Sequence, residues 1–408
     1  MRRMPFTLNS EGQELLWLAL STIVIIFPNV VGIILVVLLT LMMIWQHRKN
    51  WKQIIQSSGW FGIFILYSAL TSLTSRNFIG FLISLVYIIY VAFFAYYRSI
   101  IQAKTYLRLL KIIVLASVLV NFVAYWQYIS YVYQNSYDIF YVFKYHNIQV
   151  RPAGTLFNAN VFGVFCIFAI LIALFLLLKA NHRGRRLYYL FIIIINVVGM
   201  SLTGSRMIWP ALLASLFVML FINHRKAGLS ILVIGLCLLG ILIAFPDLYP
   251  RFASLAYAFQ DRFKIWHAGL ELFKLDPIFG SGPLTYRNSY YLISDLYKLH
   301  THSIFIELLT SYGLVGCVIL GLACKDYFKE LWRNVTRPEL RSATALILAV
   351  FVTVIAHGIV DFAIFSFQLA YIFLLIILPP TPVLEDLVHL DEQTHFIVPQ
   401  DSSHTDEP

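Results

Sequence analysis

Five side chains in this sequence are of the types needed to bind a phosphate and to move a proton. Arg151, Arg206 and Arg262 lie in separate polar stretches between apolar runs, and His300 and His302 lie two residues apart before another run. A guanidinium group is always charged and binds phosphate through two parallel hydrogen bonds. Imidazole titrates near neutral pH and can accept a proton. These groups predict an anion-binding site beside a base.

Two of the arginines occur where topology alone does not require them. Arg206 ends the short Thr-Gly-Ser-Arg turn at 203–206, and we interpret it as an anion clamp, with an arginine that snorkels to lipid headgroups as the alternative. Arg262 shares one helical face with residues spaced three and four apart: Phe259, Trp266 and Leu270. This spacing predicts a helix lying at the membrane interface. The alternative for Arg262 is a surface ion pair with Asp261 or Glu271.

Polar residues at the ends of two other apolar runs are candidates to support the site. Arg151 begins the stretch 151–160, and Asn160 enters the apolar run that follows, where an amide should face the interior of a helix bundle. An interfacial anchor is the alternative for Arg151. Asp361 follows His357 by about one helical turn. It could orient His302, pair with an arginine, or form a purely structural pair with His357.

The two histidines are expected to have different roles. His302 precedes the apolar run 304–309, and we expect it in the first turn of a helix, with Glu307 deeper in the same run. Residues two apart on a helix point about 200° apart, so His300 is expected to stay in the loop. No third or fourth ligand follows in a recognisable metal-site spacing. We therefore predict no metal and no cofactor; a histidine held at the interface is the alternative for His302.

The composition indicates that helices in a membrane position these groups. The chain has 408 residues, of which 60% are hydrophobic and only 12% charged, whereas a soluble domain carries roughly 25% charged residues. The mean hydropathy is +0.78. None of the four cysteines lies in the long polar segment, and no C-x-x-C pair occurs, which disfavours disulfides and thiolate metal sites. We predict an all-α polytopic membrane protein.

The apolar runs predict about 12 transmembrane helices, since a span needs about 20 residues. They lie near residues 13–28, 29–46, 59–74, 78–97, 108–130, 160–179, 187–203, 207–222, 227–245, 303–323, 342–357 and 362–379. One long extracytoplasmic loop, 246–302, is expected between spans 9 and 10. Residues 1–378 form a single transmembrane domain in this interpretation. The acidic remainder, 379–408, lacks apolar periodicity and is predicted to be a disordered cytoplasmic tail.

The positions of Lys and Arg predict the orientation. With the N-terminus inside, 20 of the 30 Lys and Arg residues fall in inner segments, and six of the other ten fall in the loop 246–302. Basic inner loops are the usual pattern in multi-pass membrane proteins. Both termini are therefore expected in the cytoplasm, and the net charge of +10 reflects topology, with no nucleic-acid partner. All five candidate side chains then fall on the outer face.

At these residues the chain resembles the O-antigen ligase and polymerase superfamily of bacterial envelope glycan enzymes. The matching motifs, in order, are Arg-Pro-Ala-Gly-Thr-Leu-Phe-Asn-Ala-Asn at 151–160, Thr-Gly-Ser-Arg at 203–206, Arg-Phe-Lys-Ile-Trp at 262–266, Asp-Pro-Ile-Phe-Gly-Ser-Gly-Pro at 276–283, and the stretch 302–313 that begins at His302 and ends at Gly313. The resemblance covers roughly residues 150–365. The family usually has Asn after this histidine, where the chain has Ser303.

The resemblance implies an inverting, metal-independent glycosyltransferase in the cell membrane. Its donor would be a glycan on undecaprenyl pyrophosphate and its acceptor a second glycan or glycolipid, so the chain would be a polysaccharide polymerase or a ligase. By motif match, Arg206, Arg262 and, less directly, Arg151 would hold the pyrophosphate, and His302 would be the catalytic base. His300, Asp361, Trp266 and Asn160 would support them.

Two other classes of function remain open from the sequence. A polysaccharide or lipid-linked sugar transporter or flippase would be expected to show ionisable residues at mid-span and broken helices in paired repeats. Such charges are nearly absent, and no internal repeat is present. A membrane scaffold without catalysis would not need a histidine in this position.

The charge asymmetry yields a direct topology test. A cysteine introduced at Ser281 should react from outside intact cells with an impermeant thiol reagent, and one at Gly184 should not, because the loop 246–302 is predicted to be outside and residues 179–187 inside. Both cysteines should react after the cells are lysed, which serves as the control. Labelling at Gly184 in intact cells would invert the orientation and with it the outer site.

Overall fold

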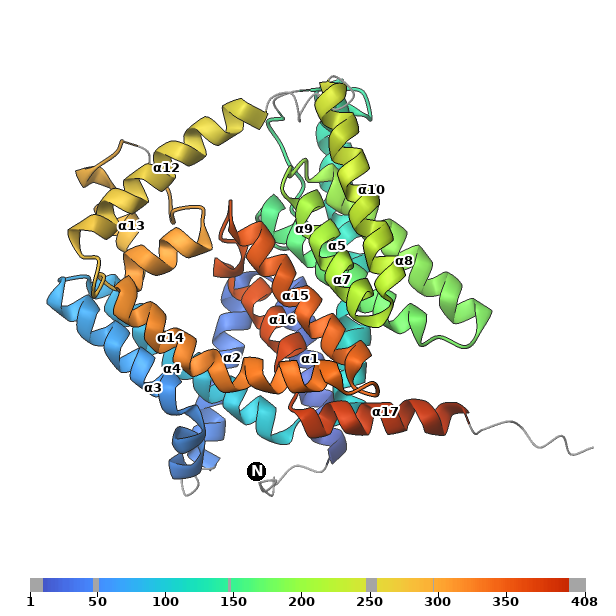
Figure 1. The fold of residues 1–408 in the computed structure, drawn as a ribbon, viewed down its shortest axis with the longest axis horizontal. Coiled ribbons are helices and arrows are strands. Elements are labelled where there is room, and N and C mark those ends of the chain that lie inside the picture. The colour runs from blue at the N-terminus through green and yellow to red at the C-terminus, as the bar shows by residue number, and fades with distance from the viewer. Residues whose placement is uncertain (1–9, 47–50, 146–147, 247–254, 296, 396–408) are drawn as a thin grey trace, which may run out of the picture.

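The computed structural model describes residues 10–46, 51–145, 148–246, 255–295 and 297–395. Within these ranges the chain is helical, with irregular connections and no β-strand. The helices of the bundle are α1 (Ser10–Ile26), α2 (Asn29–Gln46), α3 (Trp51–Thr74), α4 (Phe78–Ile100), α5 (Ala103–Gln134), α7 (Ala159–Leu178), α8 (Arg183–Leu202), α9 (Ile208–Asn223), α10 (Arg225–Ala244), α14 (Ile304–Thr336), α15 (Arg341–Gly358) and α16 (Phe367–Ile377) (Figure 1).

Every expected span corresponds to a helix, but the expected number of transmembrane helices is not confirmed. Seven helices of the described residues are long and apolar enough to cross a membrane, namely α4, α5, α7, α8, α10, α14 and α15. An eighth is possible if α16 and α17 (Thr381–His395), bent by 70°, form one broken span. The helices α1, α2 and α9 and the apolar part of α3 are shorter. Their apolar stretches have 17 residues or fewer.

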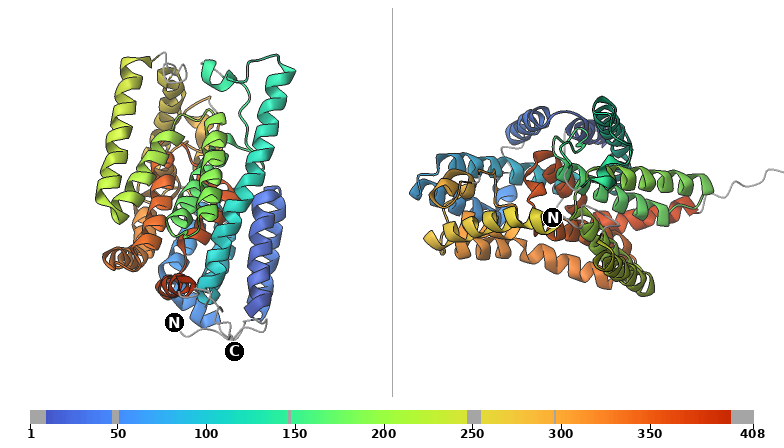
Figure 2. Two further views of the ribbon diagram at one scale, coloured as in Figure 1. Left: turned by 90° about the vertical axis from the view of Figure 1, so that its right-hand side faces the viewer. Right: turned by 90° about the horizontal axis from the view of Figure 1, so that it is seen from above.

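The helix α7 lies at the centre of the bundle, and α10 lies at its edge. Over the most apolar 18 residues of each helix, 83% of the stretch is buried in α7 and only 6% in α10. Figure 2 shows α10 on the outside, where it packs beside α9. Polar pairs connect the buried helices: Asn121 donates to Asn196 at 3.0 Å, and the hydroxyls of Ser215 and Thr353 are 2.8 Å apart. Such pairs join helices where lipid supplies no hydrogen-bond partner.

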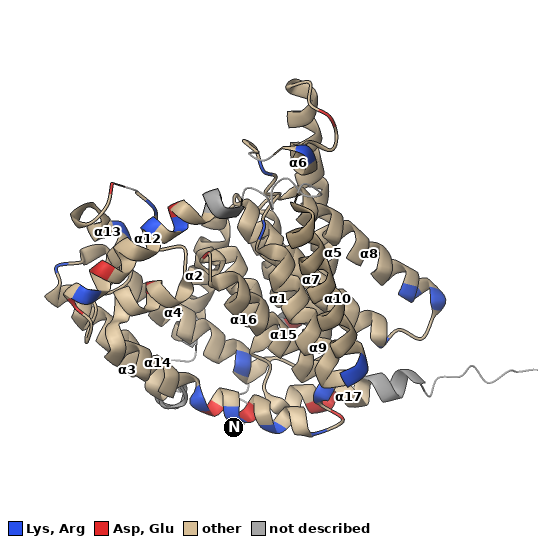
Figure 3. Cartoon of the chain, turned by 45° about the horizontal axis from the view of Figure 1, so that its top comes forward, with Lys and Arg blue, Asp and Glu red and all other residues tan. Residues whose placement is uncertain are grey.

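The segment predicted as the long loop is largely folded. It contains α12 (Leu255–Leu275), α13 (Thr285–Ser289) and a 3₁₀ turn, η2 (Tyr290–Leu292). The helix α12 buries Ile265, Ala268 and Leu272 in one small cluster with Tyr286. Together with α13 it lies at the end of the molecule opposite the N-terminus and α17 (Figure 1). Figure 3 shows Lys and Arg along the base of the bundle beside α17, on α12 and at the outer end of α8.

A glycine-rich turn fastens this folded segment to α14. Gly313 interrupts α14 with φ 59° and ψ −170°, so the amide groups of Leu314 and Val315 lose their helical partners. They donate instead to the carbonyls of Pro277 and Ile278, at 2.9 and 3.0 Å. A Cβ on Gly313 would lie 2.5 Å from the Ile278 oxygen. The sequence motif at 276–283 is therefore the anchor that positions α12.

The same turn is held from the other side by α3 and α4. The Asn77 amide donates to the carbonyls of Ser281 and Pro283, at 3.0 and 2.8 Å. The Tyr67 hydroxyl lies 2.6 Å from the carbonyl of Phe279. Both faces of the turn are thus bonded to membrane helices, which leaves α12 little freedom at its C-terminal end.

The C-terminal segment differs from the sequence expectation of a disordered tail. Residues 381–395 form α17, which buries Val383, Leu384 and Leu387 and lies across the base of the bundle (Figure 1). Glu385 pairs with Arg337 at 2.6 Å. These three apolar side chains are one, three and four residues apart, so they form a short apolar stripe on one face of a helix. The acidic composition of the segment made this stripe easy to miss in the sequence. Residues 396–408 of the expected tail lie outside the described residues.

Two small connecting elements complete the described fold. They are α6 (Tyr141–Lys144), after α5, and η3 (Ala363–Phe365), between α15 and α16. The tyrosine rings around α6 pack on one another, with the rings of Tyr137 and Tyr141 stacked at 4.5 Å. The turn before η3 carries Asp361.

The anchor predicts a strong contrast between two glycines of one helix. Gly313→Ala should lower the free energy of unfolding by at least about 1–3 kcal/mol, which is the cost of placing a residue with a Cβ in this essentially glycine-only backbone region. Gly321→Ala, also in α14 but with nothing within 4 Å of the added Cβ, should be neutral or slightly stabilising. Thermal unfolding of the purified proteins in detergent measures both. Equal stability of the two variants would contradict the anchor.

Candidate functional site

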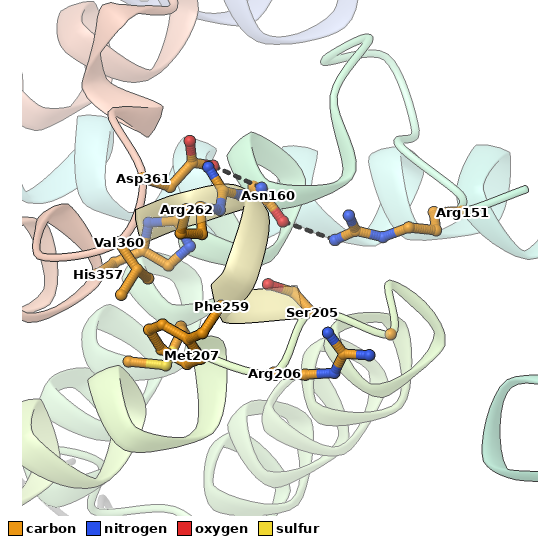
Figure 4. A pocket seen from close by; sticks show the side chains of 11 residues that line it. Arg151, Asn160, Ser205, Arg206, Met207, Phe259, Arg262, His357, Val360 and Asp361 are labelled. Carbon is orange, nitrogen blue, oxygen red and sulfur yellow. Dashed lines mark hydrogen bonds between the residues drawn. The ribbon is translucent and has the colours of Figure 1, made fainter. Parts of the chain in front are cut away.

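Five of the eight predicted site residues line one pocket at the end of the bundle that carries α12, namely Arg151, Asn160, Arg206, Arg262 and Asp361. His300, His302 and Trp266 do not line it, and His302 is connected to it through its hydrogen bond with Asp361. The cavity has a volume of about 100 Å³. Its polar lining comes from four separate stretches of chain: Arg151, Asn160, Ser205, Arg206, Arg262, His357 and Asp361 (Figure 4). Their sources are the segment before α7 and its first turn, the α8–α9 connection, α12, and the end of α15 with the turn that follows.

A continuous chain of hydrogen bonds runs along one wall of the pocket. The Arg151 guanidinium donates to the Asn160 Oδ1 atom at 2.6 Å, and its Nε donates to the Thr203 carbonyl at 2.6 Å. The Asn160 amide donates to one oxygen of Asp361. The other oxygen of Asp361 lies 2.7 Å from Nδ1 of His302. Four connections far apart in sequence are thereby joined through the Asp361 carboxylate.

Local structure explains how Arg151 and Asn160 are presented. Asn158 caps α7, with its side chain accepting from the amides of Asn160 and Val161. Gln127 of α5 accepts from the amides of Ala153 and Gly154, at 2.9 Å each. These side-chain-to-backbone bonds are the usual way of holding an irregular segment over a helix terminus.

Arg262 faces the pocket with part of its hydrogen-bonding capacity unused. Its Nη1 atom is buried and has no hydrogen-bond partner among the described residues. Burial lowers the pKa of this guanidinium, while the nearby charges of Asp361 and Asp261 act in the opposite direction. The surface ion pair with Glu271 does not form, since Glu271 pairs with Lys274 at 2.6 Å. A buried donor without a partner is a position prepared for an anion.

The other arginine of the pocket, Arg206, lies on the α8–α9 connection, opposite Arg262 and Phe259 (Figure 4). On α12 itself, the rings of Phe259 and Trp266 are 6.1 Å apart, as the helical spacing predicted. Leu270 is 41% exposed and does not line the pocket. Trp266 contributes differently, because its indole Nε1 lies 3.4 Å from the carbonyl of His302.

The protonation of the His302–Asp361 pair follows from its surroundings. Asp361 is only 5% exposed. Burial opposes its ionisation, but the hydrogen bond from His302 and the nearby charge of Arg262 hold its pKa below the usual range. An ionised carboxylate only accepts hydrogen bonds, so Nδ1 of His302 carries the hydrogen. In the neutral ring, Nε2 is then left as the proton acceptor.

The expected separation of the two histidines is wrong. Their ring centroids are 4.4 Å apart, and Nδ1 of His300 accepts a hydrogen bond from the backbone amide of His302 at 3.1 Å. The helix α14 begins at Ile304, so His302 lies ahead of the first turn, and its φ is +53°. The expectation assumed that His302 lies in the first turn of a helix, whereas a left-handed bend brings the two rings together.

Sequence reasoning also missed a possible third metal ligand. One ligand atom each from His300, His302 and Asp361 lies within 4.8 Å of the others. Asp361 is 59 residues from His302, which is why no spacing rule could pair them. Nδ1 of His302 is already engaged by Asp361, and Nδ1 of His300 by a backbone amide. Burial lowers the pKa of His300 to about 4, so this ring is neutral at pH 7.

Three residues that were not predicted as site residues help to build it. Thr203 supplies a backbone carbonyl to Arg151, and His357 lines the pocket. Glu307 accepts a hydrogen bond from the amide of Thr301 at 2.8 Å, directly ahead of His302. Its depth in the apolar run was the only sequence signal that singled it out.

Comparison with known proteins supports the resemblance that the motifs indicate. Residues 191–321 match the family model described as O-antigen ligase. This segment includes Arg206, Arg262, His300 and His302, whereas Arg151 and Asp361 lie outside it. No curated protein matches the chain.

The metal question has a direct test. We expect purified protein to contain no stoichiometric divalent metal and to keep its activity in EDTA, because the charge of Arg262 acts on both His300 and Asp361 and would repel a second cation. Elemental analysis and an activity assay with and without chelator measure this. Loss of activity in EDTA that one added divalent ion restores would instead make His300, His302 and Asp361 a metal centre.

Proposed function

We propose that the chain, whose residues 191–321 match the O-antigen ligase family model, is a membrane glycosyltransferase that transfers or polymerises lipid-linked oligosaccharide on the outer face of the cytoplasmic membrane. The donor is a glycan on undecaprenyl pyrophosphate, and the acceptor is a hydroxyl of another glycan or glycolipid. The observation that carries this proposal is the pocket in which three arginines lie beside the His302–Asp361 pair.

The arginines suit the departure of a diphosphate. As the bond between the sugar and the pyrophosphate breaks, negative charge grows on the leaving oxygen, and cationic donors already in place stabilise it. Arg262 presents the unpartnered donor, and Arg206 lines the same cavity. Arg151 is hydrogen-bonded to Asn160 and to the carbonyl of Thr203. Its main role is therefore to position Asn160, which in turn holds Asp361.

The histidine suits activation of the acceptor. Nε2 of His302 takes the proton of the acceptor hydroxyl while that oxygen bonds to the anomeric carbon of the donor. The carbon–oxygen bond to the pyrophosphate breaks in the same displacement, the lipid diphosphate leaves as an anion, and the configuration inverts. Asp361 stabilises the imidazolium that forms. No metal or cofactor takes part in this scheme.

Polymerase and ligase differ only in the acceptor. A polymerase adds the growing chain to another lipid-linked repeat, whereas a ligase moves the finished chain to a different glycolipid or cell-wall glycan. The glycans left on lipid in a deletion strain distinguish the two activities. Single repeats indicate a polymerase, and long chains indicate a ligase.

The proposal predicts the behaviour of three variants. Arg206→Lys and Arg262→Lys should each lose about 10- to 100-fold in transfer, because lysine keeps the charge but not the bidentate geometry. His302→Ala should abolish transfer at a normal protein level. Glycan profiles in a complemented deletion strain, and turnover of purified protein with a lipid diphosphate donor, measure the effect.

Arg183→Lys is the matched control, since Arg183 is an exposed arginine in the first turn of α8. It should transfer glycan at the wild-type rate. Near wild-type turnover in both pocket variants would remove the pyrophosphate assignment. Transfer that persists in His302→Ala would remove the histidine base.

A further inference from the structure

The backbone of His302 is in a conformation that its surroundings must maintain. Its φ of +53° lies in the left-handed region, where residues other than glycine are uncommon. Such conformations persist only where neighbouring contacts over-determine them, and they concentrate at functional sites. Contacts from α12, from α14 and from the residues beside His302 hold this bend.

Both peptide groups of His302 are bonded to side chains. Its amide donates to Nδ1 of His300 at 3.1 Å. Its carbonyl accepts from Nε1 of Trp266, 3.4 Å away. His300 thus closes a turn with the amide two residues ahead, which is the turn that Asn and Asp side chains commonly close. The ring of His300 is in turn packed by Phe362 and Phe365, with centroids 5.8 Å away in each case.

The residues on either side of His302 are fixed as well. The amide of Thr301 donates to the Glu307 carboxylate at 2.8 Å, and the Thr301 hydroxyl donates to the carbonyl of Ser303 at 2.9 Å. Thr301 is fully buried, and Glu307 is 5% exposed. The bend therefore rests on α14 through a buried carboxylate that plays no part in the proposed chemistry.

The helix α12 is pressed onto the same bend. A Cβ on Gly269 would lie 2.9 Å from the Thr301 side chain and 2.7 Å from that of Ile306. Only a glycine allows this approach. Since α12 carries both Trp266 and Arg262, four residues apart, the contact fixes the anion-binding guanidinium relative to His302.

We propose that His300, Thr301 and Glu307 form a positioning frame that holds the ring of His302 against Asp361, at the edge of the arginine-lined pocket. In this frame His300 acts through the hydrogen bond it accepts at Nδ1 and not as a base or a metal ligand. Glu307 acts by accepting the amide of Thr301. The inference rests on the proposed function, in that His302 receives the acceptor proton.

Two substitutions at His300 separate these roles. In His300→Asn the side-chain oxygen occupies the same position along the side chain as Nδ1 and can accept the same amide, but the imidazole is gone. In His300→Phe the ring packing remains and the acceptor is lost. We expect His300→Phe to lower kcat about tenfold with little change in KM, as the loss of one hydrogen bond allows. His300→Asn should keep most of the wild-type kcat, because its side-chain oxygen still accepts the hydrogen bond.

A second pair tests Glu307 in the same way. The amide oxygen of Glu307→Gln can still accept from Thr301, whereas Glu307→Leu cannot. Glu307→Leu should lower kcat, and Glu307→Gln should stay close to wild type. All four variants are compared at equal protein level, with thermal unfolding in detergent as the measure of folding. If Glu307→Leu does not fold, the His300 pair alone decides the question.

The outcomes separate failure of the frame from failure of the proposed function. Equal inactivity of His300→Asn and His300→Phe would show that the imidazole itself is needed, which overturns the positioning role. Full activity of His300→Phe, with His302→Ala inactive, would show that the frame does not position the base. Transfer by His302→Ala would instead refute the proposed base, whatever the His300 variants do.

Discussion

The buried carboxylate of Asp361 is the constraint on which the pocket depends. An ionised group at 5% exposure is costly unless charged and hydrogen-bonding partners surround it. Asn160 and His302 supply the hydrogen bonds, and Arg262 supplies nearby positive charge. Satisfying this one group brings together α7, α12, the end of α15 and the segment before α14. The tautomer of His302 follows from the same interaction, because the carboxylate can only accept.

The second constraint is the attachment of α12. One end of the segment is fastened by the turn at 276–283, whose carbonyls replace the helical partners lost at the Gly313 kink. Farther along α12, Gly269 lets the helix approach Thr301 closely, and Trp266 reaches the carbonyl of His302. Arg262 is thus held by a folded element and not by a free loop. A charged donor with an unused hydrogen bond is useful only if its position is fixed before the ligand arrives.

The membrane part of the structure has a simpler physical basis. Apolar helices satisfy their own backbone groups, and buried polar pairs such as Asn121 with Asn196 join them where lipid offers no partner. The central helix α7 is mostly buried, while α10 is nearly all exposed. The polar site lies at one end of this scaffold, where the irregular segments between helices can supply side chains from different parts of the chain.

The sequence by itself determined the helices and the chemistry of the candidate residues. The apolar runs predicted the position of every helix of the bundle, because a helix in lipid is specified by local composition. For α2 the predicted bounds, 29–46, are the observed ones. The motifs around Arg206, Arg262 and His302 indicated a resemblance to O-antigen ligases, and residues 191–321 match that family model. Tertiary structure alone decided which side chains meet. The pairing of Asp361 with His302 spans 59 residues, the left-handed bend brings His300 to His302, and α17 docks through a stripe hidden in an acidic segment. Local patterns carry no information on such contacts, because they arise only when distant segments pack and a buried charge must find its partners.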